Sequence, residues 1–297
     1  TGFTAMINNQ WRELSTQPAP DNFVLKVTPQ GIVERKPAFK ERLHQFGIDL
    51  QRIRFIVGSE ARTRIFDKAL GQAWLLLEPI VMALLYFFIT TVIFTYSGEQ
   101  RQFLFILTSV VFWRWFSRTI DGAPLSIIGY GAVLKQTRFP VIMVVLGFMA
   151  TETFFFLMSF IVLAAFLGWH GAFPTTAYIY LPLVVAAQFS LMLFLTVVFA
   201  VIGTFIKDLS GVLYAITGIW WYLSPGIYPV SKIPEQYLWI YMLNPFAHIL
   251  PAYRDILIDG IAPATGPLWL IVGVSSVLCV LAIRVFNWAR YYFFAFL

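Results

Sequence analysis

Residues 141–167 read VIMVVLGFMATETFFFLMSFIVLAAFL, an apolar run with a single charged residue, Glu152. A helix needs about 20 such residues to cross the hydrocarbon core of a bilayer, whereas a buried helix of a soluble protein is usually shorter. The whole chain of 297 residues has the same character, with 59% hydrophobic residues, 12% charged residues and a mean hydropathy of +0.75. About a quarter of the residues of a soluble domain are charged. The sequence therefore predicts an all-α membrane protein.

Working outward from this run, we predict six transmembrane helices, at residues 75–95, 103–120, 141–167, 177–206, 212–228 and 268–288. With the N-terminus inside, sixteen Lys and Arg residues fall on the cytoplasmic side, and only Arg101, Lys232 and Arg254 fall outside. Because cytoplasmic segments concentrate Lys and Arg, we expect a multi-pass inner-membrane protein with both termini in the cytoplasm. This orientation also explains the net charge of +6. The basic residues form no dense stripe, so we expect no nucleic acid partner.

Two segments precede the first span. Residues 1–52 are polar and apolar in mixture, with two short strands predicted on either side of a Pro-Gln-Gly turn at 29–31. They predict a small cytosolic appendage, distinct from a transmembrane domain at 53–297. Residues 53–73 have a basic amphipathic pattern at helical spacing. Such a helix is expected to lie along the inner face of the membrane.

The segment between the fifth and sixth spans differs from an ordinary loop. Residues 229–267 alternate short apolar patches with prolines, and neither patch, 237–243 or 246–250, is long enough to cross. Short re-entrant helices in the outer leaflet satisfy their backbone only where protein or a wet cavity covers them. We therefore expect these helices to line or close a pathway. The alternative is an amphipathic loop that rests on lipid.

The second predicted span contains two arginines in the stretch WRWFSR at 113–118. Arg114 and Arg118 are four residues apart, so both project from one face of a helix. An arginine in mid-membrane is costly and normally faces a cavity or a partner. Two interpretations remain open. The guanidiniums contact a phosphate or uronate of a passing substrate, or they pair with Asp121 or Glu152 or reach toward the interface.

Aromatic residues make up 18% of the chain, and several clusters lie near the predicted span ends. Interfacial belts account for most of them. Others are expected to line the route, because aromatic faces stack on the C–H faces of sugars. The predicted translocation pathway comprises Trp113, Arg114, Trp115, Phe116, Arg118, Trp220, Trp221 and Tyr222.

Motifs for other chemistry are missing from the sequence. It contains no G-x-x-x-x-G-K-[ST] loop, so we expect no ATP hydrolysis of that type by this chain and no bound cofactor. His44, His170 and His248 have no Cys or carboxylate at ligand spacing, so we expect no metal site. We also expect no catalytic residues. His248 with Asp255 and Asp259 leaves a membrane-embedded glycosyl- or acyltransferase as a minor alternative.

Two stretches on the cytoplasmic side resemble the ABC-2 type permease family, in its branch of polysaccharide exporters for O-antigen, teichoic acid and capsule. EARTR at 60–64 followed by LGQAWLLLEP at 70–79 is similar to the family's interface helix running into its first span. KQTRFP at 135–140 resembles the end of its coupling loop, within a connector at 122–140 that reads as a short apolar-faced helix. The resemblance implies that the movement of the ATPase during ATP hydrolysis is transmitted to these coupling residues: Glu60, Arg62, Arg64, Ile127, Tyr130, Val133, Lys135 and Arg138.

The most specific likeness lies on the outer side. LSPGIYPV at 223–230, then IPE at 233–235 and LNP at 243–245 through YR at 253–254, resembles the family's fifth span and outer gate helices. The implied outer gate residues are Tyr228, Pro229, Pro234, Asn244, Pro245, Tyr253 and Arg254.

The resemblance further implies an assembly and a substrate. The expected assembly is a homodimer in membrane lipid, with two copies of a cytosolic ATPase subunit that bind the ATP and Mg²⁺. The pathway would run between the two copies. The expected substrate is a polysaccharide or lipid-linked glycan, as in lipopolysaccharide biosynthesis. An ABC-2 exporter of a drug or simple lipid shares the fold and remains the alternative.

Overall fold

A computed structural model describes residues 24–28, 31–35, 39–66, 71–89, 100–131, 134 and 140–296. The chain divides into two compact units, Thr1–Arg52 and Ile53–Leu297. In the first unit, β1 (Val24–Thr28) and β2 (Gly31–Arg35) form an antiparallel pair. The two predicted strands are therefore confirmed, and the described part of the second unit is all-helical.

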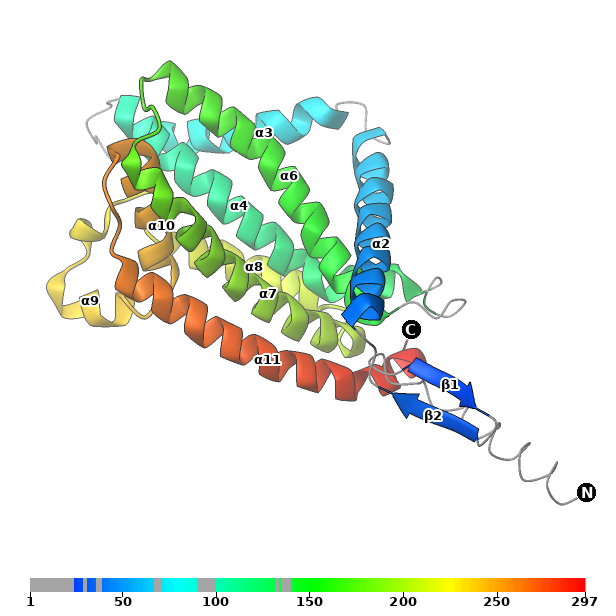
Figure 1. Ribbon diagram of the computed structural model, residues 1–297. Coiled ribbons are helices and arrows are strands. Elements are labelled where there is room, and N and C mark those ends of the chain that lie inside the picture. The colour runs from blue at the N-terminus through cyan, green and yellow to red at the C-terminus, as the bar shows by residue number, and fades with distance from the viewer. Residues whose placement is uncertain are drawn as a thin grey trace, which may run out of the picture. The chain divides into compact units, whose positions relative to one another are not determined.

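The helices of the second unit are mostly long, as Figure 1 shows. Their bounds are α3 Gly71–Phe88, α4 Gln100–Gly129, α6 Val141–Trp169, α7 Leu181–Phe205, α8 Leu209–Tyr222 and α11 Thr265–Phe296, with a short 3-10 helix, η2 (Thr176–Tyr180), before α7. Within the described residues, four segments are long and apolar enough to cross a bilayer: Arg101–Gly129, Val141–Trp169, Thr176–Phe205 and Thr265–Ala289. The multi-span prediction is confirmed at this level. The count of six stays a prediction, because α8 has only 14 residues.

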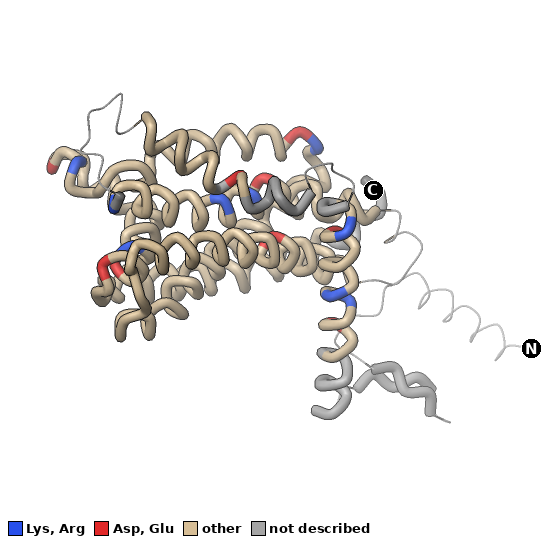
Figure 2. Tube along the Cα trace, turned by 90° about the horizontal axis from the view of Figure 1, so that it is seen from above, with Lys and Arg blue, Asp and Glu red and all other residues tan. Residues whose placement is uncertain are grey.

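The helix α4 forms the centre of the bundle (Figure 1). It packs against α3, α6, α7, α8 and α10. Of the 18-residue apolar stretch in α4, 78% is buried, whereas 22% of the corresponding stretch in α11 is buried. Figure 2 shows charged residues at the ends of the bundle and a further group of both signs midway along it. A central helix with charges in mid-bundle must find partners on its neighbours.

The connector predicted at 122–140 starts as a helix, as expected, but the prediction that this helix is separate from the second span is wrong. The helix α4 continues without a break through Pro124 to Gly129. A proline inside a helix removes one hydrogen bond and crowds the preceding turn. Here α4 crosses α7 so closely that a Cβ on Gly203 would overlap the Pro124 backbone. Tight packing therefore supports the helix where propensity alone predicts its end.

The predicted interface helix corresponds to α2 (Phe39–Phe66), which begins earlier than expected. Its Ile56 is 1% exposed and lies against α6, where a Cβ on Gly147 would be 2.6 Å from Ile56 Cδ1. Phe55 is 73% exposed. In the second unit, α2 thus has one packed and one open apolar position.

The segment between α8 and α11 consists of short helices, as its prolines predict. They are η3 (Val230–Lys232), α9 (Glu235–Tyr241), α10 (Phe246–Arg254) and the π-helical turn η4 (Asp255–Asp259). Pro229, Pro234 and Pro245 each immediately precede one of them. A proline near a helix start sacrifices no intrahelical hydrogen bond. Re-entry of these helices into the membrane stays a prediction.

We expect Gly203→Ala to lower the free energy of unfolding by about 1–3 kcal/mol, since an added methyl group must push α4 and α7 apart. The matched control is Gly273→Ala in α11, where nothing lies within 4 Å of the new methyl group. The control also corrects for the higher helix propensity of alanine. Thermal unfolding of both variants in detergent tests this, and equal melting temperatures would contradict the tight crossing.

Candidate functional site

A cavity of about 840 Å³ lies among α3, α4, α6 and α8. One part of its wall is aromatic and comprises Tyr86, Trp113, Tyr214, Trp221 and Tyr222. Another part is charged and comprises Arg114, Arg118, Asp121 and Glu152. The cavity therefore combines flat aromatic faces with charged groups that donate hydrogen bonds to oxygen atoms or accept them from hydroxyl groups.

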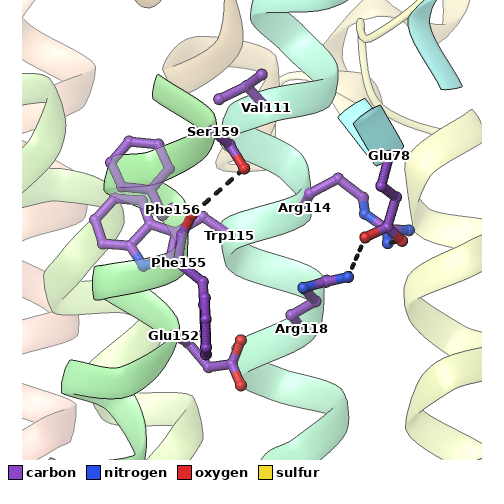
Figure 3. A pocket seen from close by; sticks show the side chains of 9 residues that line it. All are labelled: Glu78, Val111, Arg114, Trp115, Arg118, Glu152, Phe155, Phe156 and Ser159. Carbon is purple, nitrogen blue, oxygen red and sulfur yellow. Dashed lines mark hydrogen bonds and ion pairs between the residues drawn. The ribbon is translucent and has the colours of Figure 1, made fainter. Parts of the chain in front are cut away.

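The two arginines share one carboxylate, Glu78 of α3 (Figure 3). Arg114 Nη2 pairs with Glu78 Oε1 and Arg118 Nη2 with Glu78 Oε2. Asp121, one of the two predicted partners, instead accepts a hydrogen bond of 2.8 Å from Thr217 Oγ1. Glu152, the other, is 4% exposed and lines the same small pocket as both arginines. The structure thus adds an ion-pair partner that the sequence analysis missed.

A signal for Glu78 was present in the sequence. It lies in the first predicted span, between an apolar run and Pro79, where a lone carboxylate is costly without a cation. Sequence position did not reveal the pairing, because Glu78 and Glu152 lie at similar distances from the two arginines, on opposite sides of them along the chain. Asp121 and Glu152 were considered instead.

The predicted pathway residues divide between two environments. Trp113, Arg114, Arg118, Trp221 and Tyr222 line the cavity. Trp115, Phe116 and Trp220 do not. For the first two, helix geometry gives the reason, because residues 113–116 cover a full turn and cannot all face one side.

Those three aromatic residues pack in the bundle instead. The ring of Trp115 stacks on Phe156 with 4.3 Å between centroids. Phe116 is fully buried against Trp220 and Phe246. Their contribution is to the packing around the cavity.

Asn244 joins α8 to the start of α10. Its Oδ1 accepts hydrogen bonds from Trp220 Nε1 and Phe246 N, each at 3.0 Å. Its Nδ2 donates to Leu223 O at 3.1 Å and Ser224 Oγ at 2.9 Å. All four bonds of this predicted gate residue are internal, so it fastens the two segments together.

Arg254, another predicted gate residue, is 4% exposed. Its Nη1 donates to Pro225 O at 2.5 Å and Ser109 Oγ at 3.2 Å, and its guanidinium lies 3.8 Å from the centroid of Phe105. Such a position satisfies a buried cation by carbonyl, hydroxyl and aromatic contacts. Arg254 thereby connects α10 to both α4 and the chain after α8.

The remaining gate predictions fall in the same region. Tyr253 is fully buried and stacks on Phe112 of α4, with 3.4 Å between centroids. Tyr228 donates a hydrogen bond of 2.8 Å to Tyr222 O. These contacts place the outer segment against the helices that form the cavity.

Two of the predicted coupling residues contact each other. Tyr130, just after α4, donates a hydrogen bond of 3.2 Å from its hydroxyl to Glu60 Oε1 of α2. Ile127 is fully buried, whereas Arg62 is exposed. The side chain of Arg64 and residues Val133, Lys135 and Arg138 lie outside the described part of the chain.

Residues 51–258 match the ABC-2 type transporter family. The chain belongs to this family. It is 27% identical over 237 residues to the O-antigen export system permease protein RfbA of Myxococcus xanthus, covering 79% of this chain and 91% of that protein. It is 25% identical over 229 residues to RfbA of Klebsiella pneumoniae, covering 74% and 88%, and 24% identical over 204 residues to the polysialic acid transport protein KpsM of Escherichia coli, covering 68% and 79%.

The ABC-2 match begins in α2 and ends in η4. It therefore includes every helix that lines the cavity, the Glu60–Tyr130 contact and the outer segment. Membership in a transporter family and the apolar helices together indicate a multi-pass membrane protein of transport function.

We expect the double variant Arg114→Gln with Arg118→Gln to unfold at a lower temperature, because Glu78 is left without its cations. The loss should be about 2 kcal/mol, less than for a fully buried pair, since about a third of each arginine remains exposed. Adding Glu78→Gln should restore part of the stability, whereas adding Asp121→Asn should not. Melting curves in detergent separate these outcomes, and equal rescue by both would contradict the pairing.

Proposed function

We propose that this chain is the membrane permease of an ABC exporter that moves a polysaccharide or lipid-linked glycan across the inner membrane. The observation that carries the proposal is the cavity, in which aromatic rings lie beside charged groups. Aromatic faces pack on the C–H faces of sugars, and charged or hydroxyl-bearing side chains hydrogen-bond to sugar oxygens. The relatives' names, which refer to O-antigen and polysialic acid, support the same class of substrate.

A drug or simple lipid is the second candidate substrate. An acyl chain that filled the cavity would remove water from Arg114, Arg118, Asp121 and Glu152 without offering them hydrogen bonds. Desolvating a polar group without compensation costs several kcal/mol. The charged wall therefore favours a substrate that is rich in oxygen.

The transferase alternative receives no support from the positions of its candidate residues. A ring nitrogen of His248 lies 3.0 Å from Met242 O, and Asp259 pairs with Arg101. Neither these two residues nor Asp255 lines the cavity. Their contacts are those of structural residues within the outer segment.

The proposed assembly follows from the surface around the cavity. Ile219 and Tyr222 line it and are 63% and 58% exposed. Large exposed apolar faces in a membrane protein contact lipid or another subunit. We assign part of this face to a second copy, so that the pathway runs between two copies. Two cytosolic ATPase subunits would bind ATP and Mg²⁺ beneath, on the side that holds both termini.

We expect the purified chain alone to hydrolyse no ATP and to form a stable complex with a separate phosphate-loop ATPase, since its sequence lacks that loop. The complex should restore export of surface glycan in a strain from which the permease gene is deleted. Immunoblotting of surface glycan measures this. Restored drug resistance without restored glycan would favour the second candidate.

We expect Tyr130→Phe to lower export several-fold while ATPase binding and basal hydrolysis remain, because the link from α4 to Glu60 of α2 is lost. A hydrogen bond to a charged group is worth about 1.5–3 kcal/mol. The matched control is Tyr237→Phe in α9, which is 58% exposed. Export by both variants is compared at equal protein level. Export at the wild-type rate by Tyr130→Phe would show that this contact does not transmit the movement of the ATPase to the permease.

A further inference from the structure

Glu78 holds two guanidiniums in the way that a bound anion would hold them. One of its oxygens contacts Arg114 and the other contacts Arg118, as Figure 3 shows. A guanidinium is a planar fork of five N–H donors, and its strongest pairing engages both oxygens of one carboxylate or phosphate edge. A carboxylate that divides its oxygens between two forks gives neither a full bidentate partner. An anion that accepts more hydrogen bonds from the two guanidiniums would therefore bind more favourably at this position than Glu78 does.

The two arginines are accessible from the cavity. Their side chains are 31% and 33% exposed, and that of Glu78 is 15% exposed. Both arginines line the cavity wall, and together with Glu78 they also line a smaller pocket. A phosphate has more oxygens than a carboxylate and serves two forks together.

The local charge balance decides how an anion can bind. Arg114 and Arg118 lie among three carboxylates, Glu78, Asp121 and Glu152. With all five ionised, this group has no net attraction for a further anion. An anion gains only by taking the place of a carboxylate between the forks, so displacement is the binding mode that the charges permit.

Resting on the proposed function, we infer that Glu78 is an internal counter-ion that occupies an anion site. A phosphate group of the substrate, or a carboxylate that the other contacts of the substrate hold in place, replaces it between Arg114 and Arg118. The shared chemistry is a group of anionic oxygens, which either a lipid diphosphate or an acidic sugar supplies. Glu78 then acts as a selectivity residue, because only anions that bind the two forks better than it does can enter.

The test measures binding to the full chain in nanodiscs of neutral lipid by calorimetry. The probes are geranylgeranyl diphosphate, with geranylgeraniol as its uncharged control, and a sialic acid hexamer, with maltohexaose as its neutral control. Glu78→Gln removes the competitor and should tighten binding of an anionic probe about tenfold, the effect expected of one charge-assisted hydrogen bond. Arg114→Gln with Arg118→Gln should weaken it at least tenfold.

The matched control is Asp121→Asn, which removes the same charge from the cavity wall that Arg114 and Arg118 line, without vacating the position between the arginines. It should tighten binding clearly less than Glu78→Gln does. Equal effects of the two variants, or no tightening by Glu78→Gln, would overturn the inference. If Glu78→Gln does not fold, Glu78→Asp withdraws the carboxylate by one methylene. Affinity should then rise by a smaller factor, and unchanged affinity would overturn the inference.

The two probe arms distinguish the source of the anion. If only the diphosphate binds more tightly to Glu78→Gln and more weakly to the double arginine variant, the site is assigned to a lipid linker. If only the hexamer does so, the site is assigned to an acidic glycan. Failure with both rejects the anion site. The proposed function is judged separately by glycan export in the deletion strain, so a chain that exports glycan but lacks the binding pattern retains its function and loses only this inference.

Discussion

A helix that carries two arginines can cross a bilayer only if its neighbours supply the compensating groups. In this protein that helix is α4, and Arg114 and Arg118 face α3, whose Glu78 pairs with both. The requirement fixes more than one contact. It sets the rotation of α4, turns Trp115 and Phe116 into the packed interior, and leaves Trp113 on the cavity wall. The cavity is thus a consequence of how the charges are satisfied.

A second requirement shapes the segment between α8 and α11. The helix α8 ends at Tyr222 after 14 residues, and the carbonyl groups at a helix end need donors from elsewhere. Ser224 Oγ donates to Trp220 O, and Tyr228 Oη donates to Tyr222 O. Asn244 and Arg254 donate to the next carbonyl groups, Leu223 O and Pro225 O. The chain after α8 therefore completes the bonding of the helix end, and Asn244 and Arg254 hold that chain in place.

Much of this was visible in the sequence, and the failures have physical causes. Apolar runs predicted the long helices, and the prolines predicted the short ones after α8. The continuation of α4 to Gly129 was not predicted, because it contains Pro124 and because the glycine that makes room for this proline, Gly203, lies on another helix. Glu78 was missed for the same reason. Local patterns show that an arginine needs a partner, but they do not show which of several carboxylates in the chain folds against it.

The cavity also bears on how a permease of this kind could favour one substrate over another. Its aromatic side comprises Tyr86, Trp113 and Trp221. These rings can stack on many different sugars. Its charged side is more demanding, because three carboxylates surround two arginines and a buried carboxylate left unpaired is costly. A transporter with such a cavity could accept long polymers of varied sugars, because stacking does not depend on sugar identity. It would still require one anionic group at a defined place in each polymer.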